Sequence, residues 1–221
     1  MEGGFGSPPF LPTKEMITNT DLGIAVTTGY GKLRLKTAPT VTPVSVAEAK
    51  THLRIDSTFT ADDTYIETLI SVATSAAENY TNLAIMSQSW FLDIDAFPDY
   101  FNLLKGTLKT LTINSITYSD ENNASQTLAA SNYFADGSIK PARIYFAPDA
   151  TIPSTYDKPN AVIVDFTLGD TSASNVPAPI KQAILLMVGT YYETRQTVSD
   201  RTYKEIPQSA EYLLMPYRVQ G

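Results

Sequence analysis

The sequence contains no cysteine and a single histidine, His52. The lack of cysteine excludes disulfides, thiolate nucleophiles, iron–sulfur clusters and zinc sites built on sulfur. One histidine excludes multi-histidine metal centres, and any serine–histidine relay would depend on His52. No G-x-S-x-G motif accompanies it, so we expect His52 at a helix boundary or an interface. The enzyme chemistries left are carboxylate pairs, serine–lysine pairs and magnesium held by oxygen ligands.

Long apolar runs are also missing. The longest, 183–189, is far shorter than the roughly 20 residues that span a bilayer. The N-terminal segment has no basic residue before Lys14 and carries prolines and glycines where a signal peptide has its apolar core. We therefore expect neither a membrane segment nor secretion, and we predict assembly in the cytoplasm.

Positive charge is scarce, with 16 basic against 23 acidic residues, a net charge of −7. Sixteen of the acidic residues lie between positions 43 and 174, so the excess acid is in the middle of the chain. Nucleic-acid binding depends on clustered Lys and Arg. The sequence therefore predicts a surface that lets DNA pass without binding it.

Two helices are expected early in the chain. Ser45 and Glu48 have the spacing of a capping box, and the helix that follows should end near Arg54. Thr60 and Asp63 repeat that spacing before a longer helix with Asn82 as its stop. Apolar residues recur in it at intervals of three and four, namely Ile66, Leu69, Ile70, Ala73, Ala76, Ala77 and Tyr80.

The periodicity changes to two between about Ser87 and Leu168, which is typical of β-strands. Strand-like runs begin at Gln88 and continue at 110–118, 143–146 and 161–168, with turn signals between them. Outside this region, the alternation at 32–36 predicts a short edge strand whose charges face solvent. Trp90 shares a strand face with Leu92 and Ile94 and should belong to the core.

The last part of the chain returns to helix. A long helix should follow Pro177 and Pro179, and Leu185 and Leu186 make it apolar nearly all round, so it needs burial on more than one side. A short helix should lie between Pro207 and Pro216. The fold class is therefore α+β, a helical core with an inserted, mostly antiparallel β module. We divide the chain into an extended arm (1–31), a strand and helix pair (32–86), the β module (87–170), the apolar helix and a polar link (171–205) and a C-terminal helix and tail (206–221).

Candidate catalytic and metal-binding groups are weak. Asp93, Asp95 and Asp99 resemble the start of a calcium loop but lack its glycine, and the alternation of the first two fits the outer face of a strand. We predict no catalytic, metal-binding or cofactor-binding residue and no enzymatic activity. A hydrolase using these aspartates and a carbohydrate- or protein-binding β module remain as alternatives.

Several segments, taken in order, resemble the head-to-tail connector (adaptor) proteins of tailed bacteriophages and gene transfer agents. Residues 43–54 read PVSVAEAKTHLR, residues 176–195 read VPAPIKQAILLMVGTYYETR and residues 210–218 read AEYLLMPYR. Gln88-Ser89-Trp90 and residues 127–133 fall in the expected order between them. The resemblance covers about Leu33 to Val219 and leaves out the N-terminal arm.

This resemblance implies a structural virion protein in the neck, between capsid and tail. It implies a ring of twelve copies that extends the DNA channel, bound to the portal protein on one side and to a stopper or tail-terminator protein on the other. The C-terminal segment would contact the portal through Tyr212, Leu213, Leu214, Tyr217 and Arg218. The long helix after Pro179, which is apolar nearly all round, suits contacts between ring subunits through Leu185, Leu186 and Tyr192.

Overall fold

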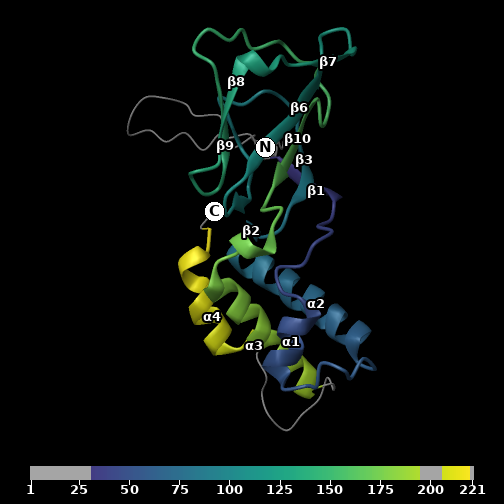
Figure 1. Cartoon of the computed structure of the whole chain (residues 1–221). Coiled ribbons are helices and arrows are strands. Elements are labelled where there is room, and N and C mark those ends of the chain that lie inside the picture. Colours follow the sequence, from purple (N-terminus) through teal and green to yellow (C-terminus); the bar gives the residue numbers. More distant parts are fainter. Residues whose placement is uncertain (1–30, 195–205, 220–221) are drawn as a thin grey trace, which may run out of the picture.

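The structure is a computed structural model, and it describes residues 31–194 and 206–219. It is an α+β fold in which four helices lie at one end and a β module at the other (Figure 1). The helices are α1 (Val46–Leu53), α2 (Asp63–Thr81), α3 (Ala178–Thr194) and α4 (Gln208–Leu214). Three short 3-10 turns accompany them, at Ala130–Asn132, Ala173–Asn175 and Met215–Tyr217. The predicted α+β class is confirmed.

The β module contains two antiparallel sheets that face each other. The larger has the order β1-β3-β10-β6-β7 and the smaller β4-β9-β8. Their bounds are β1 (Lys32–Thr37), β3 (Gln88–Ile94), β10 (Val162–Leu168), β6 (Leu111–Ser119), β7 (Ser125–Thr127), β4 (Tyr100–Asn102), β9 (Arg143–Phe146) and β8 (Tyr133–Asp136). A separate parallel pair joins β2 (Leu83–Ala84) to β5 (Gly106–Thr107) near the helices.

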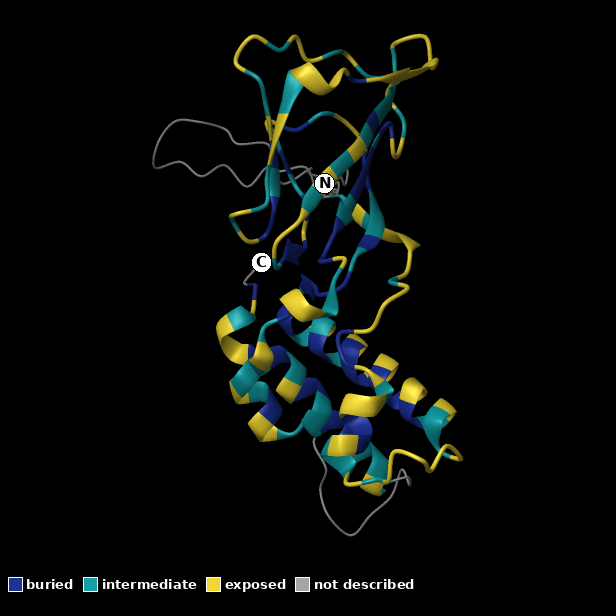
Figure 2. Ribbon diagram, in the orientation of Figure 1, coloured by how far each residue is buried: buried dark blue, intermediate teal, exposed yellow. Residues whose placement is uncertain are grey.

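Each end of the molecule has its own apolar core. Residues of all four helices form one, and the inner faces of the two sheets form the other (Figure 2). Large side chains such as Ile66, Ile70 and Met187 fill the first, while Phe101, Ile144 and Phe166 fill the second. The segment between α2 and β3 lies at the junction of the two cores, because Ala84 belongs to the second and the next residues, Ile85 and Met86, belong to the first.

Local signals predicted the first helix well and the start of the second poorly. The capping box at Ser45 is present, and Arg54 ends α1 in the left-handed conformation. Asn82 ends α2 in the same way. The predicted capping box of Thr60 and Asp63 is wrong: α2 begins after Asp62 without a side-chain cap, and Asp63 instead forms an ion pair with Lys50 of α1.

Strand β1 belongs to the large sheet, although our division grouped its residues with the helix pair. It pairs with β3 in antiparallel register, with Arg34 opposite Phe91. Its charges do not simply face solvent, because Arg34 binds Asp93 and Lys36 binds Asp165. Both carboxylates are buried, so β1 carries the cations that neutralise the outer face of the sheet.

Candidate functional site: the contact surfaces

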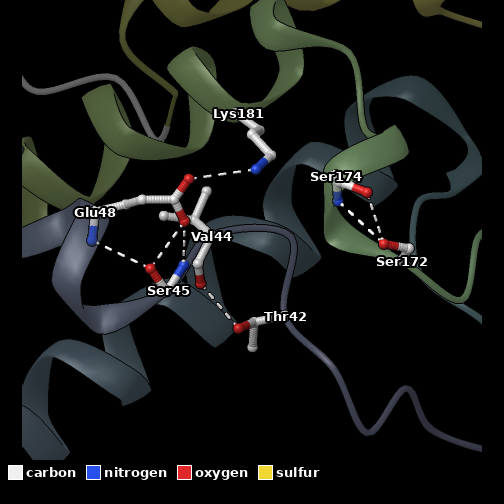
Figure 3. Close-up of polar contacts among 7 residues, drawn as sticks. All are labelled: Thr42, Val44, Ser45, Glu48, Ser172, Ser174 and Lys181. Carbon is white, nitrogen blue, oxygen red and sulfur yellow. Dashed lines mark hydrogen bonds and ion pairs between the residues drawn. The ribbon is translucent and has the colours of Figure 1, made fainter.

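Two of the segments that carry the resemblance, 43–54 and 176–195, meet at the start of α1. Glu48 accepts hydrogen bonds from the Ser45 backbone N–H at 2.7 Å and the Ser45 hydroxyl at 2.9 Å. Its other oxygen lies 3.3 Å from Nζ of Lys181 on α3 (Figure 3). These hydrogen bonds, above all that from the Ser45 backbone, hold the pKa of Glu48 below its usual range. One carboxylate thus caps α1 and ties it to α3.

His52 completes this contact between α1 and α3. A Cβ atom at Gly189 would lie 3.5 Å from Nε2 of His52, so the small residue admits the imidazole ring against α3. The expectation of an interface histidine is met inside the chain, at a helix–helix interface. Its surroundings indicate a packing role.

Helix α3 is the central helix of its core, in contact with α1, α2 and α4. Its inner face is buried, whereas Leu185, Leu186 and Tyr192 are only half-buried and pack against the edge of the core. The Tyr192 hydroxyl donates a hydrogen bond to Asp62, and its ring contacts Tyr65. Helices of the same chain therefore supply much of the burial that this apolar helix requires. A contact between neighbouring subunits of an oligomeric ring through Leu185, Leu186 and Tyr192 stays a prediction.

The C-terminal segment divides into anchors and exposed side chains. Leu214 is fully buried, Leu213 and Tyr217 pack against the helical core, and Arg218 stacks over the ring of Tyr80. Tyr212 is 65% exposed. Of the five residues predicted to contact the portal, Tyr212 and Arg218 are thus exposed, and the contact itself stays a prediction.

Sequence reasoning missed Met215, which is 63% exposed beside Tyr212. A methionine just before a proline gives no sign in the sequence of facing outward. Exposed Met and Tyr side chains are common at protein–protein contacts. Together, Tyr212 and Met215 form what we call the C-terminal patch.

A half-buried carboxylate, Glu78, and a buried ammonium group, Lys105, lie where the helices meet the β module. Glu78 of α2 accepts hydrogen bonds from the Ile85 N–H and the Gln88 side chain, both at 2.7 Å. Burial raises the pKa of Glu78 and lowers that of Lys105, whose ammonium group lies 5.0 Å from the centre of the Trp90 ring. Trp90 is half-buried against the β core, as its strand pattern predicts.

The aspartates considered for metal or hydrolytic chemistry have other partners. Asp93 lies on the outer face of β3, since its neighbours Leu92 and Ile94 are in the core, but it is buried there and paired with Arg34. Asp95 accepts a hydrogen bond from the Asn160 N–H at 2.8 Å. Across residues 31–194 and 206–219, no three acidic or histidine side chains are grouped as metal ligands would be. Nor does a helix in these ranges have the length and apolar character needed to span a membrane.

Another surface that sequence reasoning missed is a row of aromatic residues on the outer face of the small sheet. Tyr145 is directly opposite Tyr100 on one neighbouring strand and Phe134 on the other. The three residues are far apart in the sequence, so only strand pairing brings them together. We call them the aromatic row.

Comparisons with known proteins identify the kind of protein to which these surfaces belong. Residues 43–140 match the model of a family described as Phage gp6-like head-tail connector protein. This segment belongs to the head-tail connector family. It contains the Ser45–Glu48 capping box, so the contact between α1 and α3 involves residues that the family model covers.

Solved structures resemble this chain over most of its length. A chain from the neck of an empty gene transfer agent (GTA) particle, computed with C6 symmetry, is 25% identical, with a TM-score of 0.70. A chain from the native GTA virion is 24% identical with a TM-score of 0.69, and one from the native neck, computed with C12 symmetry, is 24% identical with a TM-score of 0.65. Each match covers 86% of this chain and 96% of the other chain.

No curated protein sequence matches this chain significantly. The family and the neck structures nevertheless agree, and they support a structural connector role in a virion. The solved structures come from the neck or the virion of GTA particles.

Proposed function

We propose that this chain is a ring-forming subunit of a virion neck, placed between the portal and the stopper or tail, where it extends the DNA channel. The main support is the match of its fold, over 86% of its length, to a neck protein of a GTA particle. Neck particles computed with C6 and C12 symmetry agree with a closed ring, for which we propose twelve copies. The four packed helices would form the connector core.

Within such a ring we assign the outer edge of α3 to the contact between neighbouring subunits. Leu185, Leu186 and Tyr192 lie half-buried there, so a neighbour would complete their burial. A ring interface is heterologous, which means that this edge would meet a different surface of the next copy.

We assign the C-terminal patch to the portal. Tyr212 and Met215 expose large apolar side chains, with Arg218 nearby, while Leu214 and the partly buried Leu213 and Tyr217 fix the segment on the helical core. Aromatic, Met and Arg side chains are enriched at protein–protein contacts. The anchors would keep the patch rigid, which lowers the entropy cost of binding.

Electron microscopy of the chain mixed with its cognate portal tests the proposal. We expect a ring stacked on the portal. The variant Tyr212→Ser/Met215→Ser should lose portal binding with its melting temperature unchanged, because both side chains are already exposed. Its matched control is Val72→Ser, an apolar residue on α2 that is 49% exposed and should leave binding intact.

The surface variant is a sharper probe than removal of the whole C-terminal segment. Truncation before Pro207 would delete the buried Ala210 and Leu214 from the helical core, so lost binding could reflect lost folding. Unchanged portal binding by a folded Tyr212→Ser/Met215→Ser protein would contradict the portal assignment. Absence of both ring and portal binding in the wild-type chain would contradict the connector proposal.

A further inference from the structure

The aromatic row is exposed, and it does not take part in the packing between the two sheets of the β module. The ring of Tyr145 stacks on that of Tyr100 with centroids 5.9 Å apart, and Phe134 continues the row on the edge strand β8. Phe134 is 60% exposed and Tyr145 38%. The alternate residues Phe101 and Ile144 point inward and are fully buried, so they, rather than the row, hold the two sheets together.

Polar groups border the row on one side. Arg143 lies two residues before Tyr145 on the same strand face, and its guanidinium carbon is 5.0 Å from the centre of the Tyr100 ring. Beyond it, Lys109 and Lys140 line a hollow together with Asp136. Three basic side chains against one acidic one make this corner positive in a chain whose net charge is −7.

A surface of this composition suits a proline-rich peptide. Exposed aromatic rings bind segments of the pattern P-x-x-P, because prolines pre-form an extended polyproline II helix whose ordering costs little entropy. The carbonyl groups of such a helix carry no internal hydrogen bonds, so a neighbouring arginine can donate to them.

The chain contains one such segment outside the part that the structure describes. Residues 7–12 read SPPFLP, in which Pro9 and Pro12 have the P-x-x-P spacing. Residues 1–30 contain three acidic residues and one basic residue, which complements the positive corner beside the row. The segment also supplies Phe10 and Leu11 as apolar side chains for the aromatic rings.

The connection is long enough for the segment to reach the row of its own chain. Eighteen residues separate Pro12 from Gly31, and a fully extended chain of that length spans about 60 Å. Gly31 lies against Leu92 in the core between the sheets, which in such sandwiches are about 10 Å apart. The linker therefore has ample length to pass round the edge of the module.

We propose that residues 7–12 dock in an extended conformation on the aromatic row of their own chain, with the rings of Tyr100, Tyr145 and Phe134 as the platform. The arm then covers an exposed aromatic surface of the β module. This assignment is independent of the connector role, since it concerns contacts within one chain.

Photo-cross-linking of the full-length chain tests the docking. Phe134 is replaced by p-benzoylphenylalanine, the protein is irradiated, and the cross-linked peptides are sequenced by mass spectrometry. Unsubstituted chains labelled with heavy isotopes are mixed in, so that a cross-link within one chain differs in mass from one between two chains. We expect a light, intrachain product that joins position 134 to residues 7–12.

Two matched variants keep the result interpretable. Pro9→Gly/Pro12→Gly in the same photo-reactive chain should lose that product, because it removes the pre-formed extended conformation. The photo-reactive residue at Phe59, an aromatic that is 47% exposed on the α1–α2 loop, should give no arm product. Circular dichroism verifies that each variant is folded.

The other outcomes would overturn the proposal. A product with the arm of a heavy chain, or with another region of the β module, would mean that residues 7–12 do not cover their own row. An arm product that survives Pro9→Gly/Pro12→Gly would show contact without recognition of the prolines. No arm product from position 134 in folded protein would remove the docking altogether.

Discussion

At the scale of single residues, the capping box of α1 is the clearest local signal in the chain. Replacing Ser45 by Ala removes the acceptor of the Glu48 N–H and should lower the free energy of unfolding by about 1 kcal/mol. Thr51→Ala is the control, because its hydroxyl only bonds back to the Ala47 carbonyl within the helix and its loss should have little effect. Urea unfolding measures both, and equal effects would argue against the cap.

Glu78 makes a prediction about pH. Burial raises its pKa in the folded chain, so its contribution to stability is fully present below the unfolded pKa and is lost as pH rises through the folded value. The glutamine of Glu78→Gln keeps an oxygen that can accept hydrogen bonds from the Ile85 N–H and the Gln88 side chain. Unlike the carboxylate, this side chain cannot ionise. The free energy of unfolding of this variant, minus that of the wild type, should therefore be larger at pH 7 than at pH 5.

The control for this experiment is Glu67→Gln, on an exposed position of the same helix. This variant removes one negative charge from the surface of α2, so it measures the effect of losing that charge alone. Denaturant titrations at pH 5 and pH 7 give the four differences needed. A Glu78 difference that does not grow with pH would show that burial does not penalise the carboxylate.

At the scale of secondary-structure elements, β1 is held in its sheet by charge as well as by backbone pairing. Arg34 is 45% exposed in its side chain, whereas that of its partner Asp93 is only 4% exposed. Arg34→Ala would leave a buried carboxylate without its cation, which should cost about 1–3 kcal/mol of stability. Lys32→Ala, an exposed residue on the same strand, should change stability by less than about 0.5 kcal/mol.

Elements were predictable from the sequence where their signals are local. The caps of α1, the stop of α2 at Asn82 and the long strands β3, β6, β9 and β10 follow from spacing and periodicity within a few residues. Strands β2, β4, β5 and β7 have only two or three residues, too few to show a period. These short strands can be recognised only from their pairing with neighbouring strands in the folded structure.

The candidate contact surfaces were less predictable for the same reason. Lys36 and Asp165 are 129 positions apart, and the aromatic row combines three separate strands. Tyr212 and Leu214 sit two residues apart in one motif, yet one is exposed and the other fully buried. The resemblance identified the C-terminal segment, but only packing separates its anchors from its exposed side chains.

At the scale of the whole molecule, the charge distribution predicts behaviour toward DNA. A chain with a net charge of −7 offers few counterion-releasing contacts to phosphates, although it has basic side chains beside the aromatic row. We expect no retardation of double-stranded DNA in a gel-shift assay at about 150 mM salt. A basic DNA-binding protein in the same gel is the control, and a shifted band would contradict a passive channel surface.

The covalent path between the two ends of the molecule has a mechanical consequence. The chain crosses from one end to the other three times, after β1, after α2 and after β10. Two of the crossings touch at a bridge between Met86 and Asp170, where Gly169 leaves no room for a side chain. A single linker lets two bodies swivel, whereas several separate attachments resist both bending and twisting. Torque applied to the β module would therefore rotate the helices together with it.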